Sequence, residues 1–480
     1  MICCKQILLT IFATNLLFAQ PKQVWVDSTY LSLTLDQKIG QLFMPMVFSQ
    51  GDQSHYQQIS EDIKRFHLGG IIFSKGTIAE QARLTNLFQS QSKVPLLIAM
   101  DAEWGMAMRL HDAKPFPYQM TLGAIQNDSL LYQMGYSMAN RQRRLGVHLN
   151  FSPVVDINTN AKNPVIGLRS LGSDPLSVTQ KAGMLLRGMQ DGGLMTSIKH
   201  FPGHGDTETD SHSSLAMIPS DSSRLWEIEI PPFQDMIQEG VDAIMVAHVH
   251  SPDYQPYSYT PASMSKFWVN DILKEKLEFR GAIVTDGMGM GGIVRNYSDA
   301  YALIQVINAG CDIIIQNNSF EKSINTVEKA VLEGKISEQR INEAALKMLK
   351  MKEKIGLHLN HKISLNHFQN SVGSRENKTT ASEIAAQAIT CVRLNKNLLP
   401  LTELEDNIIY VIDMYDHEFN HSMSVTTKGL KKYGLNIKPY QIDESDSKRM
   451  IDVIIDEIPK SSIVLVNAFV SHKAWKDRVS

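Results

Sequence analysis

The sequence predicts an α/β protein, made of a (β/α)8 TIM-type barrel followed by a partial doubly wound α/β sandwich domain. Short apolar runs rich in β-branched residues alternate along the chain with longer segments of helical periodicity. Continuous apolar strands that alternate with helices indicate a parallel sheet covered on both faces. Eight such runs within roughly 330 residues fit the size of a barrel that carries insertions.

Eight segments are the expected barrel strands. They lie at residues 42–48, 70–74, 95–101, 147–156, 194–200, 242–248, 282–287 and 311–317. Helices are expected between them, for example at 78–91, 177–193 and 299–310. The last of these ends on Gly310, a residue type that commonly terminates helices. A long helix at 337–357 would close the barrel, so we expect the barrel domain to span residues 20–357.

A second unit is expected after the barrel. Residues 358–380 are polar and irregular, which is typical of a linker. Residues 381–480 then alternate a helix with strands at 408–414, about 435–442 and 462–470, which is the beginning of an open doubly wound sheet. Because the pattern stops just past an apolar strand, we expect only part of such a domain.

The first nineteen residues differ from the rest of the chain. Lys5 precedes an apolar run at 7–18, and the small residue Ala19 follows it. This pattern is typical of a secretory signal peptide, and the run is too short to span a bilayer comfortably. We therefore expect cleavage near Ala19, a periplasmic or secreted protein, and no stable membrane insertion afterwards.

The composition of the 480 residues excludes some partners. Hydrophobic residues make up 43% and charged residues 20%, as in ordinary soluble domains. The net charge of −3 and the absence of a strongly basic run argue against a nucleic-acid partner. Cys311 and Cys391 lie in predicted core segments, so we expect buried apolar residues and not a disulfide or metal site.

Polar residues gather at the carboxyl ends of the predicted strands, where barrels place their chemistry. Buried polar groups are costly unless they are paired or functional, so five strands that end in this way predict an active site at that rim. The residues are Asp101, Asn150, Asp156, Lys199, His200, His248, His250 and Asp286.

One loop, at residues 199–215, reads KHFPGHGDTETDSHSSL. It could form a metal site, a purely structural loop, or a proton donor. Pro202, Gly203 and Gly205 exclude the helical i, i+4 histidine pair of common zinc hydrolases, which leaves metal binding less favoured. The metal alternative would draw on His200, His204, His212, Asp206 and Asp210.

Of the three alternatives for this loop, proton delivery is favoured. Asp210 and His212 are two residues apart, so both side chains can face the same way on an extended segment. A carboxylate beside an imidazole stabilises its protonated form and makes it an acid or base near neutral pH. We therefore expect no metal and no cofactor.

Asp286 lies in VTDGMGMGG, at 284–292, and ends a predicted strand without a basic neighbour in sequence. A carboxylate at the rim fits a nucleophile that forms a covalent glycosyl intermediate. The same residue could simply cap the glycine-rich turn that follows, and the spacing leaves both interpretations open.

These motifs, together with FSPVVDIN at 151–158 and NPVIGLRSLGSDP at 163–175, resemble the family 3 glycoside hydrolases over residues 33–357. The similarity is greatest to bacterial β-N-acetylglucosaminidases that act on peptidoglycan fragments. The resemblance implies that Asp286 is the nucleophile and that Asp210 and His212 form the acid/base dyad. Residues in matching positions hold the sugar hydroxyls in that family; they are Asp101, Arg169, Lys199 and His200.

The resemblance thus implies an exported retaining β-N-acetylhexosaminidase whose substrate is a carbohydrate, namely cell-wall fragments that end in β-linked N-acetylglucosamine. A β-glucosidase or glycoside phosphorylase of the same family, or a non-catalytic carbohydrate-binding barrel, are the alternatives. The presence of both Asp286 and His212 argues against the last. Two departures from the branch are Trp104, which could stack on a sugar or pack internally, and a displaced Arg109.

Overall fold

The computed structural model describes residues 24–211, 213–219, 222–255, 259–316, 319–365, 375–393, 407–415, 425–443, 446 and 448–469. The expected signal peptide at 1–19 lies outside these residues. Within the described part of the chain, no helix is long and apolar enough to cross a membrane.

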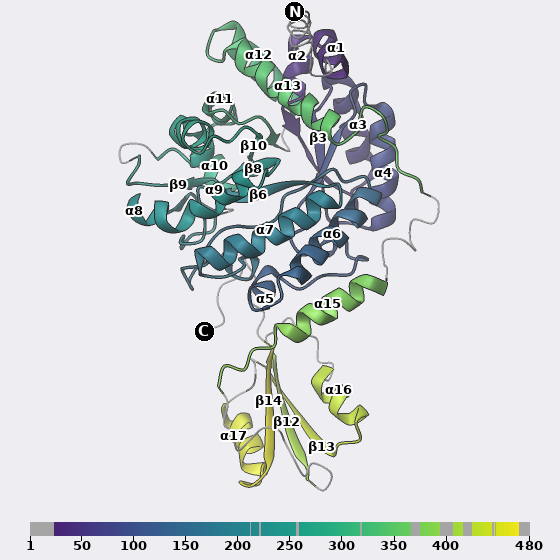
Figure 1. Ribbon diagram of the computed structural model, residues 1–480, viewed down its shortest axis with the longest axis vertical. Coiled ribbons are helices and arrows are strands. Elements are labelled where there is room, and N and C mark those ends of the chain that lie inside the picture. The colour runs from purple at the N-terminus through teal and green to yellow at the C-terminus, as the bar shows by residue number, and fades with distance from the viewer. Residues whose placement is uncertain are drawn as a thin grey trace, which may run out of the picture.

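A ring of eight parallel strands forms the centre of the larger unit. Figure 1 shows helices on the outside of these strands. Seven of the strands make one sheet in the order β10-β8-β6-β5-β4-β3-β2. The strand β1 pairs with β11, and β11 meets β10 through a bridge between Val284 and Ile313. Pro45, which has no N–H, separates β1 from β2, so these two segments are one interrupted strand. All eight expected strands are therefore confirmed.

The barrel strands are β1 (Phe43–Met44), β2 (Met46–Phe48), β3 (Gly70–Ser74), β4 (Leu97–Met100), β5 (Leu149–Asn150), β6 (Met195–Phe201), β8 (Ala243–Val246), β10 (Ala282–Thr285) and β11 (Ile314–Ile315). A small additional pair is formed by β7 (Ala216–Met217) and β9 (Val249–His250).

Helices surround the ring, and several begin at a residue whose side chain accepts a backbone N–H of the first turn. Such caps satisfy amides that have no partner within the helix. They are Asp52, Thr77, Asp174, Ser298, Ser319 and Ser337. Gly310 adopts a φ of 116° and ends α11, as the sequence predicts.

The longer helices around the barrel are α1 (Val24–Ser32), α2 (Leu35–Gly40), α3 (Gln53–Phe66), α4 (Ile78–Gln91), α5 (Gln119–Gly123), α6 (Ser129–Arg144), α7 (Pro175–Asp191), α9 (Pro231–Gln238), α11 (Asp299–Ala309), α12 (Phe320–Leu332) and α13 (Glu338–Lys354). Short or irregular helical segments are η1 (Met106–Met108), η2 (Gly167–Arg169), α8 (Ser222–Arg224), η3 (Leu225–Glu229), η4 (Ala262–Met264), η5 (Phe267–Lys276) and α10 (Gly291–Val294).

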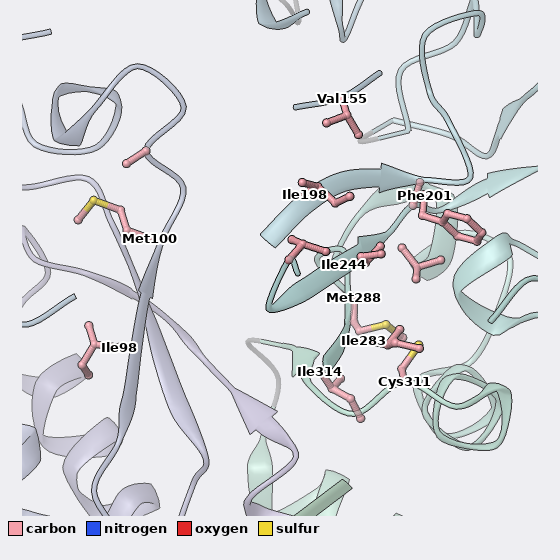
Figure 2. Close-up of a cluster of buried hydrophobic side chains, with 14 of the residues drawn as sticks. Ile98, Met100, Val155, Ile198, Phe201, Ile244, Ile283, Met288, Cys311 and Ile314 are labelled. Atoms are coloured by element: carbon pink, nitrogen blue, oxygen red, sulfur yellow. The ribbon is translucent and has the colours of Figure 1, made fainter. Parts of the chain in front are cut away.

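The strands bury both of their faces, because alternate side chains point to opposite sides of the sheet. Leu97 and Ala99 belong to the cluster inside the ring, whereas Ile98 and Met100 belong to the cluster between strands and helices. Figure 2 shows part of this outer cluster, with Ile198 and Ile244 from neighbouring strands. Met348 and Met351 of α13 join the inner cluster, so this helix closes one end of the barrel, as expected.

A three-stranded parallel sheet follows, in the order β13-β12-β14. Its elements are β12 (Ile409–Tyr415), α16 (Val425–Lys432), β13 (Ile437–Asp443), α17 (Lys448–Glu457) and β14 (Ile463–Phe469), with both helices flanking the sheet (Figure 1). This is the expected β-α-β-α-β start of a doubly wound domain. The preceding α15 (Arg375–Gln387) begins within the segment that the sequence favours as a linker, and it contacts α6.

The two cysteines of the described residues differ in their surroundings. Cys311 is buried, and burial raises the pKa of its thiol to about 12. Cys391 is exposed, so the expectation of a second buried cysteine is wrong. It lies beyond the end of α15, where no element among the described residues covers it.

Candidate active site

The predicted substrate-binding residues and Asp286 reach one end of the barrel from three strands and one long connection. Asp101 directly follows β4, Lys199 and His200 lie on β6, and Asp286 directly follows β10. Arg169 belongs to η2, in the long connection that follows β5. Parallel strands of a barrel point their carboxyl ends at the same rim, which is why residues so far apart in sequence meet here.

An ion-pair network occupies the centre of this rim. The Lys199 Nζ atom lies 2.7 Å from Asp101 Oδ1 and 2.8 Å from Glu103 Oε1. Arg169 donates to both oxygens of Glu103, with Nη2–Oε1 at 2.8 Å and Nε–Oε2 at 3.0 Å. Arg109 Nη2 approaches the second oxygen of Asp101 at 2.6 Å. Arg109, although displaced in sequence, therefore still pairs with Asp101.

Burial and charge act in opposite directions on the two carboxylates. Burial alone would raise the pKa of Asp101, but Lys199 and Arg109 outweigh it and lower that pKa to about 2. Burial likewise opposes ionisation of Glu103, and Arg169 and Lys199 nevertheless hold its pKa far below the ordinary value. Both groups are therefore anionic at neutral pH and accept hydrogen bonds only.

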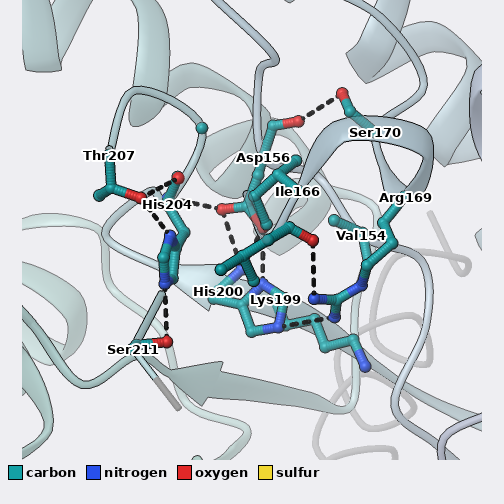
Figure 3. Close-up of polar contacts among 12 residues, drawn as sticks. Val154, Asp156, Ile166, Arg169, Ser170, Lys199, His200, His204, Thr207 and Ser211 are labelled. Atoms are coloured by element: carbon teal, nitrogen blue, oxygen red, sulfur yellow. Dashed lines mark hydrogen bonds and ion pairs between the residues drawn. The ribbon is translucent and has the colours of Figure 1, made fainter. Parts of the chain in front are cut away.

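His200 is held between an acid and a cation (Figure 3). Its Nδ1 lies 2.6 Å from Asp156 Oδ2, and its Nε2 lies 3.1 Å from Arg169 Nη2. A guanidinium group only donates, so Nε2 must accept and the ring proton sits on Nδ1, where Asp156 accepts it. His200 thus orients the Arg169 side chain.

The HFPGHGD turn of the loop is fixed by side chains that hold its backbone. Asp156 Oδ1 accepts the His204 N–H at 2.7 Å, and Asn163 Nδ2 donates to the carbonyls of His204 and Gly205 at 2.7 and 3.0 Å. A Cβ at Gly205 would lie 1.8 Å from the Ile157 carbonyl oxygen, so only glycine fits there. The turn is consequently rigid where it follows β6.

His204 has a structural place in this turn. Its two ring nitrogens contact Thr207 Oγ1 at 2.7 Å and Ser211 Oγ at 2.9 Å. Burial lowers the pKa of His204 to about 4, so the ring is neutral near pH 7. Among the described residues, no group of three or more potential ligands is placed to hold a metal ion.

His212 lies outside the described residues, but the chain on both sides of it is described. The Asp210 carbonyl accepts the N–H groups of Ser213 and Ser214 at 3.0 and 3.1 Å. The Gly292 N–H donates to the Ser211 carbonyl at 3.2 Å, and a Cβ at Gly292 would approach the Ser211 and Ser214 carbonyls at 3.3 Å. The segment that carries Asp210 and His212 is therefore bound to the chain that follows Asp286.

Asp286 is half-buried, and its Oδ1 accepts the Gly287 N–H at 2.7 Å. The Gly287 carbonyl contacts His248 Nε2 at 3.1 Å, and His248 Nδ1 contacts Ser263 Oγ at 2.7 Å. His248, which the sequence placed at the rim, thus supports the turn of Asp286. The capping bond to Gly287 and a reaction at the rim are compatible, because the bond fixes the carboxylate orientation.

Three residues of the site were not assigned by sequence reasoning. Glu103 binds two of the predicted cations, Asp156 orients His200, and Asn163 holds the loop. Asp156 is already visible as a polar residue at a strand end, and Glu103 lies two residues beyond Asp101. Trp104 is half-buried, with its ring 4.7 Å from that of Tyr118 in an edge arrangement.

Glu229 is a buried carboxyl group that packs against Gly203 of the loop. The side chain is buried against Gly203, where an added Cβ would lie 2.7 Å from Glu229 Cβ. Neither carboxyl oxygen has a hydrogen-bond partner among the described residues, and Arg224 Nη1 lies 3.7 Å from Oε1. Burial, and then the charge of Asp156, raise the pKa of Glu229 to about 8 against the opposing charge of Arg224.

This arrangement predicts that Glu229→Gln stabilises the protein at pH 8 and changes little near pH 5. Between the ordinary pKa of 4.5 and the raised value, the unfolded chain releases a proton that the folded chain retains. The free energy of unfolding of the wild type must therefore fall as pH rises through this window. A gain of a few kcal/mol is expected at pH 8, since one pKa unit is about 1.4 kcal/mol.

Urea unfolding at pH 5 and pH 8 measures this effect, with Glu227→Gln as the matched control. Glu227 lies on the same segment and is exposed, so its substitution should leave the pH dependence unchanged. If Glu229→Gln altered stability equally at both pH values, the carboxyl group would not titrate as described.

Comparison with known proteins places this arrangement in a family. Residues 34–351 match the N-terminal domain of glycosyl hydrolase family 3. A β-N-acetylglucosaminidase/β-glucosidase of Cellulomonas fimi is 28% identical over 399 residues, which cover 81% of this chain and 70% of that protein. A β-hexosaminidase of Nitrosomonas eutropha is 32% identical over 299 residues, which cover 58% of this chain and 84% of that one.

Two solved structures are also similar. A family 3 β-N-acetylglucosaminidase from Paenibacillus sp. strain FPU-7 has a TM-score of 0.78 at 30% identity and covers 91% of this chain and 85% of its own. The β-glucoside phosphorylase BglX has a TM-score of 0.79 at 25% identity, with 92% and 78% covered. The family match spans well over half of the chain and includes the whole ring of strands and its rim. This protein therefore belongs to glycosyl hydrolase family 3.

Proposed function

We propose that this family 3 enzyme is a retaining β-N-acetylhexosaminidase that removes terminal β-linked N-acetylglucosamine from its substrate. The observation that carries the proposal is the Gly292–Ser211 hydrogen bond, which joins the Asp210–His212 segment to the chain after Asp286. This bond holds the described residues next to His212 against the turn that follows Asp286, which supports a shared role for the two residues. The similarity to a β-N-acetylglucosaminidase and a β-hexosaminidase supports the choice of sugar.

The ion-pair network next to them suits sugar binding. Asp101 is anionic and half-covered, so its oxygens can accept hydrogen bonds from two adjacent hydroxyl groups. Lys199 and Arg169 can donate to the same ring, and His200 keeps Arg169 in place. Charge-assisted hydrogen bonds of this kind are strong and fix the orientation of the sugar.

In the proposed reaction, Asp286 attacks the anomeric carbon, and the new carbon–oxygen bond forms as the bond to the leaving oxygen breaks. The protonated imidazole of His212 gives its proton to that leaving oxygen. In the second step His212 takes a proton from water, the water oxygen attacks the anomeric carbon, and Asp286 leaves as a carboxylate. Two inversions give net retention, and Asp210 stabilises the charged imidazole throughout.

We further propose that the enzyme is exported and acts on fragments of peptidoglycan. The pattern at residues 1–19 supports export to the periplasm or the medium, where such fragments are present. No cofactor and no nucleic acid is required by the proposed chemistry.

The proposed specificity predicts faster turnover of nitrophenyl β-N-acetylglucosaminide than of nitrophenyl β-glucoside. Purified protein is assayed with both substrates, with and without phosphate and with and without a chelator. NMR identifies the anomer of the sugar that is released first. The β-anomer of N-acetylglucosamine is expected, at a rate that phosphate and a chelator do not change. A faster reaction on the glucoside, an α-anomer, or a sugar phosphate as product would contradict the proposal.

The phosphate arm of this assay has a specific motive. One protein of similar structure is named a β-glucoside phosphorylase. A phosphorylase uses phosphate in place of water to release the sugar. Phosphate-dependent release of nitrophenol would assign that second activity here.

A further inference from the structure

A pocket lies at the end of the barrel opposite the candidate active site. It opens at the amino-terminal ends of β6, β8 and β10, beside Met195, Asp242 and Gly281, and one side of α13 covers it. Its volume of about 600 Å³ is within the range of small-molecule sites. We call this space the basal pocket.

Cationic side chains dominate the lining of the basal pocket. Six of them, Lys274, Arg280, Arg340, Lys347, Lys350 and Lys354, accompany two carboxylates, Asp242 and Glu343. Four of the six belong to α13, where spacings of three, four and seven residues place side chains on one helix face.

The carboxylates near the pocket already form ion pairs with some of these cations. Asp242 lies 2.5 Å from Lys354 Nζ and also accepts the Thr196 N–H at 2.9 Å. The buried Asp312, behind the lining, pairs with Arg340 at 2.5 Å and with Lys347 at 3.1 Å. Both acids also accept strand N–H groups, and they compensate Lys354, Arg340 and Lys347.

The remaining cations have no such partner. No carboxylate of the described chain lies within the 4 Å ion-pair distance of Lys274, Arg280 or Lys350. The Nε–H of Arg340 is buried and has no acceptor among the described residues. Lys274 is half-buried, and burial lowers the pKa of its amine against the opposing charge of Asp312, while Arg340 and Lys347 add to the lowering. Like charges held together in this way are stabilised by an anion placed between them.

The wall of the pocket is not uniformly polar. Phe279 and Leu346 contribute apolar surface next to the cations. A phosphate ion alone would leave most of the volume empty, whereas an organic group attached to it could pack on this surface. The lining therefore resembles a site for a small organic molecule with a multiply charged head.

We propose that the basal pocket binds a small molecule that carries a phosphate or diphosphate group. Lys274, Arg280 and Lys350 contact the oxyanion. Guanidinium and ammonium groups both bind such oxygens through charge-assisted hydrogen bonds. Binding at this end leaves the mouth of the barrel open to substrate.

Thermal unfolding in the presence of inorganic pyrophosphate tests the basal pocket, at an ionic strength held constant with sodium chloride. We expect a saturable rise in Tm of about 2–5 °C for the wild type. The triple variant Lys274→Gln, Arg280→Gln, Lys350→Gln should show at least about tenfold weaker apparent affinity, or about 1.4 kcal/mol. Its activity on the chromogenic substrate should remain that of the wild type.

The matched control removes three positive charges outside the basal pocket. Lys64→Gln, Lys266→Gln and Lys322→Gln alter three exposed lysines outside the pocket, and this variant should retain the full Tm response. Equal responses in both triple variants would overturn the proposal, because they would show nonspecific screening or binding at the cations of the active site.

A second arm separates a free phosphate compound from a lipid headgroup. Vesicles of phosphatidylglycerol are sedimented with the wild type and with the pocket variant. Absence of co-sedimentation, together with the pyrophosphate response, supports a soluble ligand. Co-sedimentation that the pocket variant abolishes, without a response to pyrophosphate, would overturn the proposal in favour of a membrane surface.

Discussion

Asp286→Ala is expected to lower kcat/KM on nitrophenyl β-N-acetylglucosaminide by about 10⁴-fold or more, with little change in Tm. Loss of a covalent nucleophile removes both the intermediate and the stabilisation of positive charge at the anomeric carbon. The fold should tolerate the change, because the carboxylate is only half-buried and accepts a local backbone N–H from Gly287. Steady-state kinetics and thermal unfolding of the same preparation measure both effects.

Azide provides the decisive control for this variant. A small anion can enter the space that the carboxylate leaves and attack the anomeric carbon directly. The product would then be the α-glycosyl azide, because only one inversion takes place. If azide restored no activity and Asp286→Ala retained a substantial rate, Asp286 would act only as a cap of its turn.

Substitution of His212, the proposed proton donor, should slow the reaction by an amount that depends on the leaving group. His212→Ala is expected to slow substrates with poor leaving groups far more than a dinitrophenyl substrate, whose leaving oxygen needs no proton. Equal loss of rate on both substrates would exclude His212 as the proton donor.

Glu103→Ala is expected to lower the free energy of unfolding by about 3–5 kcal/mol. The Glu103 side chain is fully buried and balances Lys199 and Arg169, whose side chains are 2% and 8% exposed. Removal of the acid leaves two buried cations with fewer partners, and such uncompensated charge is costly. Urea unfolding gives the change in free energy if the m value is preserved.

An exposed ion pair provides the comparison. Glu321 pairs with Arg65 at 2.6 Å, but their side chains are 52% and 63% exposed. Glu321→Ala should therefore cost less than about 1 kcal/mol. A Glu103→Ala variant no less stable than Glu321→Ala would show that Asp101 alone can compensate both buried cations.

The barrel was predictable because its pattern is local and repeated. Each strand is a short apolar run, each connecting helix has its own start and stop residues, and both faces of every strand are buried. The polar ends of strands were predictable for the same reason, since Asp101, Lys199, His200 and Asp286 interrupt apolar runs at one edge.

The contacts within the site were not predictable in the same way. Lys199 reaches Asp101 and Glu103 across nearly one hundred residues, and nothing near Glu103 in sequence indicates that it accepts two cations. The proton position on His200 depends on Asp156 and Arg169 together, which belong to a separate connection. Cys391 was misplaced because an apolar neighbourhood in sequence does not ensure that another element covers it.

The single backbone hydrogen bond between Gly292 and Ser211 has a consequence for anyone who recombines this enzyme with its relatives. It ties together two connections that are about eighty residues apart, so neither can be exchanged alone without leaving an amide or a carbonyl facing a foreign surface. A chimaera that transfers residues 199–215 should also transfer residues 284–292 from the same parent. The two loops are inherited, in engineering terms, as one part.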